Sequence, residues 1–201
     1  SASLALLPEI SALREKFKDR NRFVLCGMGG SSLGPEVIAA SNGRDLFIFD
    51  STDPHYAVHA IGDDLAKTLV IVSSKSGSTI ETSSQRALFE GKFSESGLNP
   101  TEHIIFVTDP GSPLDIDVRA AGFSVINADP NVGGRFSVLS AFGLVPSALV
   151  GVDIEQLLRN AQVEKESFLA NPAAILDIAY LLIAESKQYI AFTDDGSKVP
   201  G

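Results

Sequence analysis

The side chains best suited to chemistry lie in a loop rich in hydroxyl groups, Ser73-Ser74-Lys75-Ser76-Gly77-Ser78-Thr79, called here the hydroxyl loop. It carries five hydroxyls and one ammonium in seven residues, directly before a stretch of helical character. Hydroxyls and the unpaired amides at a helix start can surround the oxygens of a phosphate, and the helix dipole favours its charge. The simpler alternative is a solvated turn in which Thr79 caps the helix. The density of hydroxyls favours phosphate binding.

A second candidate is the glycine loop, Cys26-Gly27-Met28-Gly29-Gly30-Ser31-Ser32-Leu33-Gly34-Pro35. Glycines let a backbone approach a ligand closely, and the helix that follows presents free N–H groups to an anion. A dinucleotide-binding fingerprint requires glycine where this chain has Ser32, although Asp50 imitates its ribose-binding acid. A P-loop ends in Lys followed by Ser or Thr, whereas this loop ends in Gly34-Pro35. A tight strand-to-helix turn without a ligand remains the alternative.

The third candidate is the arginine loop, Asn131-Val132-Gly133-Gly134-Arg135-Phe136-Ser137. Its two glycines also permit close approach of a ligand. Arg135 is expected to open the following helix, where a positive charge is unfavourable for the helix dipole, and this indicates another use for the side chain. Without the other two loops, a surface arginine would be the preferred interpretation of Arg135.

Alternating segments between residues 22 and 126 must position these loops. Short β-branched or aromatic runs predict five strands, at Arg22–Leu25, Leu46–Phe49, Thr68–Val72, His103–Val107 and Phe123–Ile126. Helical stretches separate them, at Gly34–Ala40, Pro54–Ile61, Ile80–Ser94 and Pro113–Ala120. Nearly continuous apolar strands divided by helices indicate a parallel sheet covered on both faces. We therefore predict an α/β fold, a three-layer, doubly wound, five-stranded parallel sheet of the flavodoxin type.

The order of the strands decides whether the loops meet. With the order 2-1-3-4-5, the first and third strands are neighbours and the chain leaves them in opposite directions. Such folds bind ligands in the crevice above the carboxyl ends of those two strands. The glycine loop and the hydroxyl loop would flank that crevice.

Additional helices are expected at both ends. A leading helix at about Leu4–Lys18 gives a first segment, 1–20, and the domain built on the sheet occupies 21–150. Residues 151–201 form a helical extension leading to a missing second domain. Three helices are predicted after the last strand: one at about Ser137–Leu149, one after Asp153, and one from Asn171-Pro172, where proline takes the first helical position. Ile175, Ile178, Leu182 and Ile183 give the last of them an apolar stripe, and Tyr189–Phe192 resembles a strand.

Composition narrows the class of protein. The formal net charge of −9, with both signs mixed along the chain, disfavours a nucleic-acid or anionic-membrane partner. The apolar stretch Ala173–Ala184 is shorter than the roughly 20 residues of a membrane span and reads as a buried helix. Cys26 is the single cysteine, which fits a reducing cytoplasm. We expect no signal peptide, no metal and no cofactor, and we interpret His55, His59 and His103 as structural or surface residues.

Together the three loops resemble the phosphoglucose isomerase family. Gly27-Met28-Gly29-Gly30-Ser31-Ser32-Leu33-Gly34-Pro35 resembles its first signature, and Ser74-Lys75-Ser76-Gly77-Ser78-Thr79-Ile80-Glu81-Thr82 resembles its phosphate loop. Val132-Gly133-Gly134-Arg135-Phe136-Ser137-Val138-Leu139-Ser140 resembles its arginine signature, continuing into Ala141-Phe142-Gly143-Leu144. All three occur in the order of the family. The first two alone would indicate only the wider class of sugar isomerase (SIS) domains.

The resemblance implies the interconversion of glucose 6-phosphate and fructose 6-phosphate, in glycolysis and gluconeogenesis, through ring opening and a cis-enediol. It implies a substrate-binding set of Gly30, Ser31, Ser74, Lys75, Ser76, Ser78, Thr79 and Gly134, in which Lys75 acts through its backbone or its charge. Arg135 is the expected catalytic residue, because a fixed cation stabilises charge that develops on enediol oxygens. Glu81 matches a family position near the pocket, and the resemblance implies a supporting catalytic role for it. The full-length enzyme is expected to self-associate.

Two departures from the family pattern matter. Ser76-Gly77 stands where animal and enterobacterial enzymes carry Thr-Phe, so the chain looks more like the bacterial branch that includes transaldolase fusions. The family's proton-shuttling glutamate, ring-opening histidine and late lysine lie beyond the matched region, so we expect this fragment to bind substrate without turnover. The alternatives are a bifunctional phosphoglucose/phosphomannose isomerase, a non-catalytic phosphosugar-sensing SIS module and, last, a nicotinamide-binding domain.

Overall fold

The computed structural model describes residues 2–184 of the chain. It divides into two compact units, Ser1–Glu155 and Gln156–Gly201, which are described separately. The first unit contains the sheet, and the described part of the second is helical.

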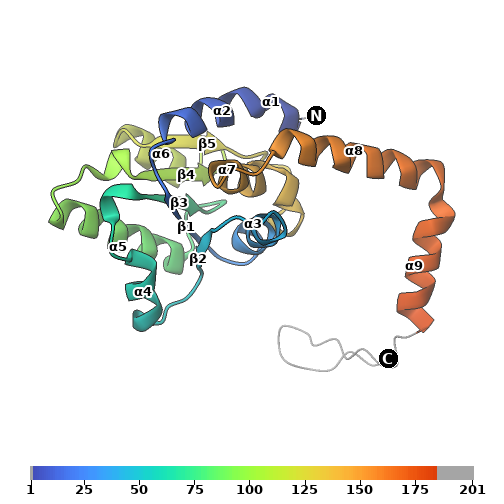
Figure 1. The fold of residues 1–201 in the computed structure, drawn as a ribbon, viewed down its shortest axis with the longest axis horizontal. Coiled ribbons are helices and arrows are strands. Elements are labelled where there is room, and N and C mark those ends of the chain that lie inside the picture. Colours follow the sequence, from blue (N-terminus) through green and yellow to red (C-terminus); the bar gives the residue numbers. More distant parts are fainter. Residues whose placement is uncertain (1, 185–201) are drawn as a thin grey trace. The chain divides into compact units, whose positions relative to one another are not determined.

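A single parallel sheet forms the centre of the first unit (Figure 1). Its strand order is β2-β1-β3-β4-β5, which confirms the predicted five-stranded layer of the flavodoxin type and meets the condition under which the first two loops flank one crevice. Gly27 at the end of β1 pairs in register with Ser73 at the end of β3. The glycine loop and the hydroxyl loop therefore leave the sheet side by side. The strands are β1 (Arg22–Gly27), β2 (Phe47–Phe49), β3 (Thr68–Ser73), β4 (Ile104–Thr108) and β5 (Ser124–Asn127).

Helices cover both faces of this sheet, as right-handed crossovers between parallel strands require. One face carries α4 (Pro54–Ile61), α5 (Ile80–Glu95) and α6 (Pro113–Ala120). The other carries α2 (Leu7–Lys16), α3 (Gly30–Ser41) and α7 (Ala141–Leu149), with α7 packed against both of its neighbours. The 3-10 helices η1 (Leu65–Lys67) and η2 (Pro100–Glu102) lead into β3 and β4.

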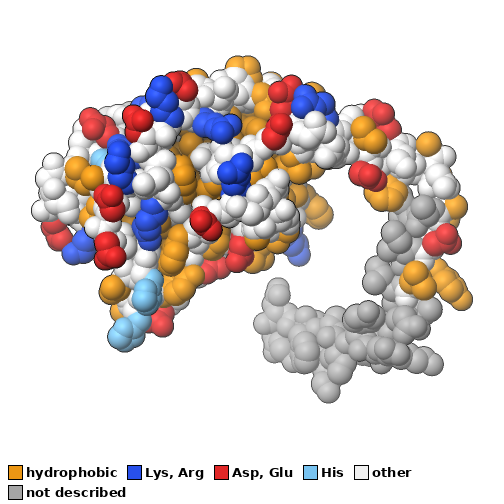
Figure 2. Space-filling view, in the orientation of Figure 1, with side chains coloured by type: hydrophobic (Ala, Val, Ile, Leu, Met, Phe, Trp, Pro, Cys, Tyr) orange, Lys and Arg blue, Asp and Glu red, His pale blue; other side chains and the backbone are white. Residues whose placement is uncertain are grey.

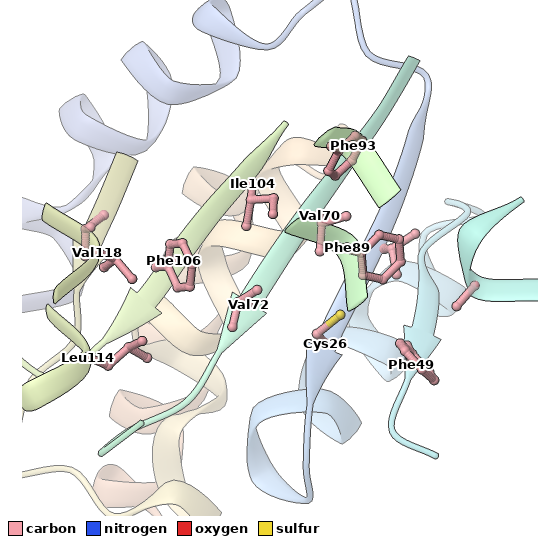
Figure 3. Close-up of a cluster of buried hydrophobic side chains, with 13 residues drawn as sticks. Cys26, Phe49, Val70, Val72, Phe89, Phe93, Ile104, Phe106, Leu114 and Val118 are labelled. Atoms are coloured by element: carbon pink, nitrogen blue, oxygen red, sulfur yellow. The ribbon is translucent and has the colours of Figure 1, made fainter. Parts of the chain in front are cut away.

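The core beneath α5 follows from the two-residue period of the strands. Val70 and Val72 of β3 point to the face of the sheet that α5 covers, and they cluster with Phe89 and Phe93 of that helix. All four side chains are buried (Figure 3). The intervening Ile71 is also buried, and by alternation it faces the opposite helix layer. Burying one such side chain contributes roughly 1.5–3 kcal/mol, so both layers are fixed to the sheet.

The predicted leading helix is in fact two helices, α1 (Ala2–Ala5) and α2, with Leu6 between them. Pro8 has no N–H to donate to the carbonyl four residues earlier, and this interrupts a continuous helix. The next predicted helix starts earlier than expected, because α3 begins at Gly30 and contains Pro35. Gly29 has φ 58°, a conformation that favours glycine, and it turns the chain sharply after β1. The helix can therefore start at the next residue.

The helix predicted to begin at Ser137 begins instead at Ala141. Residues Gly134–Leu139 form a 3-10 helix, η3, so Arg135 lies in η3 and does not open an α-helix. Ser140 separates the two with an extended backbone, and its hydroxyl accepts a hydrogen bond from the Phe142 amide. The end of η3 packs closely against α7 because Gly143 lacks a Cβ. A Cβ there would lie 1.8 Å from the Val138 carbonyl oxygen.

Two further helices follow, α8 (Ile154–Ala170) and α9 (Pro172–Ala184). They start after Asp153 and Asn171, as predicted. The predicted strand Tyr189–Phe192 lies outside the described residues. Within residues 2–184, no helix combines the length and the apolar character needed to cross a membrane. Figure 2 shows Lys and Arg side chains interspersed with Asp and Glu on the face in view.

Candidate functional site

The glycine loop folds back over the neighbouring strand. A Cβ built on Gly27 would lie 3.2 Å from the Ser73 carbonyl oxygen and 3.3 Å from the Ser31 Cβ. The first turn of α3 therefore sits directly above the ends of β1 and β3. This is the crevice in which doubly wound sheets bind ligands.

The arginine loop reaches the same place and contacts the glycine loop through bare backbone. A Cβ on Gly30 would lie 2.3 Å from the Gly134 carbonyl oxygen and 3.3 Å from the Arg135 amide nitrogen. One turn further along α3, a Cβ on Gly34 would lie 2.8 Å from a Val138 methyl carbon. The structure thus brings together Gly30, Gly134 and Arg135, which are far apart in the sequence.

Arg135 is presented to solvent. Its side chain is exposed, and its guanidinium makes no hydrogen bond or ion pair with any of the residues that the structure describes. The neighbouring Ser137 is buried and donates its hydroxyl hydrogen to the Gly134 carbonyl, at 2.7 Å. The backbone next to Arg135 is therefore fixed while its charge stays available for a ligand.

The hydroxyl loop precedes the sixteen-residue helix α5. Thr79 occupies the N-cap position, yet within the described part of the chain its hydroxyl makes no capping hydrogen bond. The Thr79 side chain therefore does not cap the helix, and the first amides of α5 are left to other partners. Ser76 and Ser78 share a hydrogen bond between their hydroxyls, at 2.6 Å, and the Ser74 hydroxyl accepts from the Gly77 amide, at 3.1 Å.

Lys75 is already engaged. Its ammonium lies 2.7 Å from an Asp109 carboxylate oxygen and donates a hydrogen bond to the Pro130 carbonyl, at 3.0 Å. Both partners belong to loops after β4 and β5. The structure therefore places the lysine side chain against those loops, and the expectation that Lys75 contributes through its backbone or its charge stays a prediction.

Glu81 lies at a different part of the sheet edge from Gly30 and Arg135. It lines a pocket of about 370 Å³ between the end of β2 and the start of α5, together with Phe49, Ser51, Ile80 and Gln85 among others. Neither Gly30 nor Arg135 lines this pocket. The structure therefore does not bring the two expected catalytic residues into one cavity.

In β3 and α5, three buried polar atoms have no hydrogen-bond partner among the described residues: the hydroxyls of Ser73 and Thr82 and the amide oxygen of Gln85. Ser73 belongs to the hydroxyl loop, but the other two were not singled out from the sequence. The sequence did contain a signal for Thr82 and Gln85. Thr82, Gln85, Phe89 and Phe93 form the buried stripe of α5, and polar residues occupy its first two positions.

The three histidines lie outside the three loops. His103 is buried, stacks on Phe93 with ring centroids 4.7 Å apart, and places Nδ1 3.1 Å from the Thr68 carbonyl oxygen. Burial lowers its pKa below the usual histidine value. His55 and His59 are exposed on α4. All three are therefore structural or surface residues, as predicted. Residues 2–184 contain no group of three side chains that could hold a metal ion.

Solved structures of similar fold include phosphosugar isomerases. A hypothetical protein from Thermus thermophilus superposes with a TM-score of 0.78 at 34% identity, over 89% of this chain and 45% of that one. A glucose-6-phosphate isomerase from Chlamydia trachomatis gives a TM-score of 0.65 at 31% identity, over 74% of this chain and 29% of that one.

Relatives identified by sequence comparison are also named glucose-6-phosphate isomerase. Glucose-6-phosphate isomerase from a Cyanothece species is 36% identical over 80% of this chain and 33% of its own length. The enzyme of the same name from Carboxydothermus hydrogenoformans is 35% identical over 89% of this chain and 43% of its own length. The chain thus spans well under half of these relatives. The family model of phosphoglucose isomerase matches residues 13–197. With its three signature loops gathered at one edge of the sheet, this chain belongs to the phosphoglucose isomerase family.

Proposed function

We propose that this chain is the sugar-phosphate-binding half of a glucose-6-phosphate isomerase, whose complete form interconverts glucose 6-phosphate and fructose 6-phosphate. The observation that carries the proposal is the contact between Gly30 and the Gly134 carbonyl. Through it, a permanently charged arginine lies beside the crevice that the hydroxyl loop flanks. That arrangement suits a ligand with a phosphate at one end and reacting carbons at the other.

The phosphate binds at the start of α5. The hydroxyls of Ser74, Ser76, Ser78 and Thr79 donate to its oxygens, together with the free amides of the first helical turn. The dipole of α5 favours the dianion at this end. The existing hydrogen bond between Ser76 and Ser78 means that these hydroxyls already converge, so little ordering is needed when the phosphate arrives.

The sugar lies towards Gly30, Ser31 and Gly134. Arg135 faces the carbons that change oxidation state and stabilises the negative charge that grows on the enediol oxygens in the transition state. Glu81 has a supporting role from the adjoining pocket. Ring opening and proton transfer between C1 and C2 require an acid and a base that the family provides beyond the matched residues. The fragment alone therefore binds without appreciable turnover.

The same proposal covers the setting of the complete enzyme. It works in the cytoplasm, associates with a second copy of itself and needs no cofactor, nucleic acid or membrane. Ser76-Gly77 supports placing it in the bacterial branch that includes transaldolase fusions. These expectations rest on the family and on the composition of the chain.

The direct test is an NMR titration of the ¹⁵N-labelled chain with fructose 6-phosphate, and with NAD in parallel. The amides of Gly30–Ser32 and Ser74–Thr79 should shift together with the phosphosugar and stay unchanged with NAD. A response of the glycine loop to NAD, with none to the phosphosugar, would refute the proposal in favour of a dinucleotide site. Amides at the carboxyl end of α5, such as Lys92, serve as internal controls.

A further inference from the structure

The side chain of Lys75 joins three segments of the site. It belongs to the hydroxyl loop, its ion-pair partner Asp109 directly follows β4, and its second acceptor is the carbonyl of Pro130. Pro130 immediately precedes Asn131, the first residue of the arginine loop. A single ammonium therefore connects the loop expected to hold the phosphate with the loop that carries Arg135.

The main chain of Lys75 is held at the same place. Its carbonyl accepts hydrogen bonds from the Asp109 amide and from the Thr108 hydroxyl, both at 3.1 Å. The preceding residue, Ser74, donates its amide hydrogen to the Val107 carbonyl, at 3.0 Å. The backbone at Lys75 is thus fixed to the end of β4, and the side chain cannot swing into the crevice without breaking both contacts of its ammonium.

The ion pair is partly shielded from water. The side chain of Asp109 is 17% exposed and that of Lys75 is 35% exposed. The second carboxylate oxygen of Asp109 is buried and has no partner within the part of the chain that the structure describes. Asp109 therefore depends on the ammonium, because a buried carboxylate without a cation is costly.

We propose that Lys75 and Asp109 are positioning residues: Asp109 holds the Lys75 ammonium in place, the ammonium ties the hydroxyl loop to the Pro130 carbonyl just before the arginine loop, and the ammonium is not a phosphate ligand. This inference rests on the proposed sugar-phosphate site and concerns how that site is held. The charge of the phosphate is then met by the hydroxyls and by the start of α5, since Asp109 already neutralises the lysine.

The variant Asp109→Asn distinguishes a positioning role of Lys75 from direct phosphate binding, because the two roles predict opposite changes in phosphate affinity. Removing a carboxylate beside the site makes the local potential more positive and releases the ammonium, so a direct ligand would bind phosphate more tightly. A positioning pair predicts the opposite. Loss of the ion pair should weaken phosphate binding about fivefold, the equivalent of one partly exposed salt bridge. Lys75→Arg keeps a cation for Asp109 and should retain most of the affinity.

The experiment is a titration of the ¹⁵N-labelled chain with inorganic phosphate, following the amides of Ser74–Thr79 and of Asn131–Arg135. In the unaltered chain both groups should respond together. In Asp109→Asn the arginine-loop amides should shift before phosphate is added and should lose their response to it. Asp117→Asn is the matched control, because it removes one carboxylate that pairs with Arg86 elsewhere on the surface.

Each outcome is decisive. Unchanged or tighter binding by Asp109→Asn overturns the positioning role and leaves the proposed phosphate site intact. Absence of any response of Ser74–Thr79 in the unaltered chain refutes the phosphate site, and the inference falls with it. If Asp109→Asn does not fold, the double variant Lys75→Met with Asp109→Asn removes both charges. A preserved arginine-loop response in that variant equally overturns the inference.

Discussion

Replacing Gly30 by alanine should separate the glycine loop from the arginine loop. The new Cβ would lie 2.3 Å from the Gly134 carbonyl oxygen, and ordinary contact begins at 3.4 Å, so one backbone has to retreat by about 1 Å. Neither neighbour is the flexible end of a side chain, since the second close atom is the Gly134 carbonyl carbon at 2.7 Å. Forcing such a shift costs roughly 1–3 kcal/mol.

The effect on turnover should exceed the effect on stability. Arg135 follows the displaced carbonyl directly, and a misplacement of about 1 Å at a catalytic group can cost about a hundredfold in rate. We therefore expect Gly30→Ala to lower kcat/KM of the complete enzyme by about two orders of magnitude. Urea unfolding of this chain should show a loss of about 2 kcal/mol.

Gly91→Ala provides the control. Gly91 lies inside α5, and a Cβ there would meet nothing within 4 Å. Alanine should therefore stabilise the chain by roughly 0.5–1 kcal/mol and leave turnover unchanged. If Gly30→Ala retained full turnover and an unchanged free energy of unfolding, the contact between the two loops would be absent and the assembly of the site described above would be wrong.

Three further results are expected. Arg135→Ala in the complete enzyme should lower kcat far more than it raises KM, because the charge it stabilises develops in the transition state; steady-state kinetics showing an effect on KM alone would exclude that role. Ser74→Ala combined with Thr79→Ala should weaken fructose 6-phosphate binding to this chain at least about tenfold, and calorimetry that finds undiminished affinity would move the phosphate elsewhere. Burial lowers the pKa of His103, so the folded chain disfavours its protonation and stability should fall as the pH drops below about 6.5 towards the folded pKa. His103→Phe should flatten that slope in urea unfolding measured between about pH 7 and pH 5, whereas His59→Gln, at an exposed position, should not; an unchanged slope in His103→Phe would assign it to other groups.

Much of the fold could be predicted because it depends on short-range patterns. The apolar run of β3 and the helical stretch of α5 are each legible within one segment, and the rules for parallel sheets then leave few strand orders to consider. The three loops were identifiable for the same reason. Each concentrates glycine, hydroxyl or cationic residues where a strand ends, which is where such sheets bind ligands.

Predictions from local patterns were wrong where contacts with other segments decide the backbone conformation. Nothing around Phe136 distinguishes a 3-10 turn from the start of an α-helix, and the outcome depends on the Val138 carbonyl packing over Gly143. Lys75 was expected to serve the phosphate through its backbone or its charge because its loop resembles the phosphate loop of phosphoglucose isomerases. Its partners, Asp109 and Pro130, become neighbours only when the loops after β4 and β5 are placed beside it.

Periodicity and residue type act over a few neighbouring residues, and they were sufficient for the α/β class, the five strands and the three candidate loops. Three other features required the folded chain: Gly30 touches Gly134, Arg135 is left without a partner among the described residues, and the ammonium of Lys75 is taken by Asp109. The two contacts join segments far apart in the chain. They follow from the packing of whole helices and loops against one sheet, which no single segment encodes.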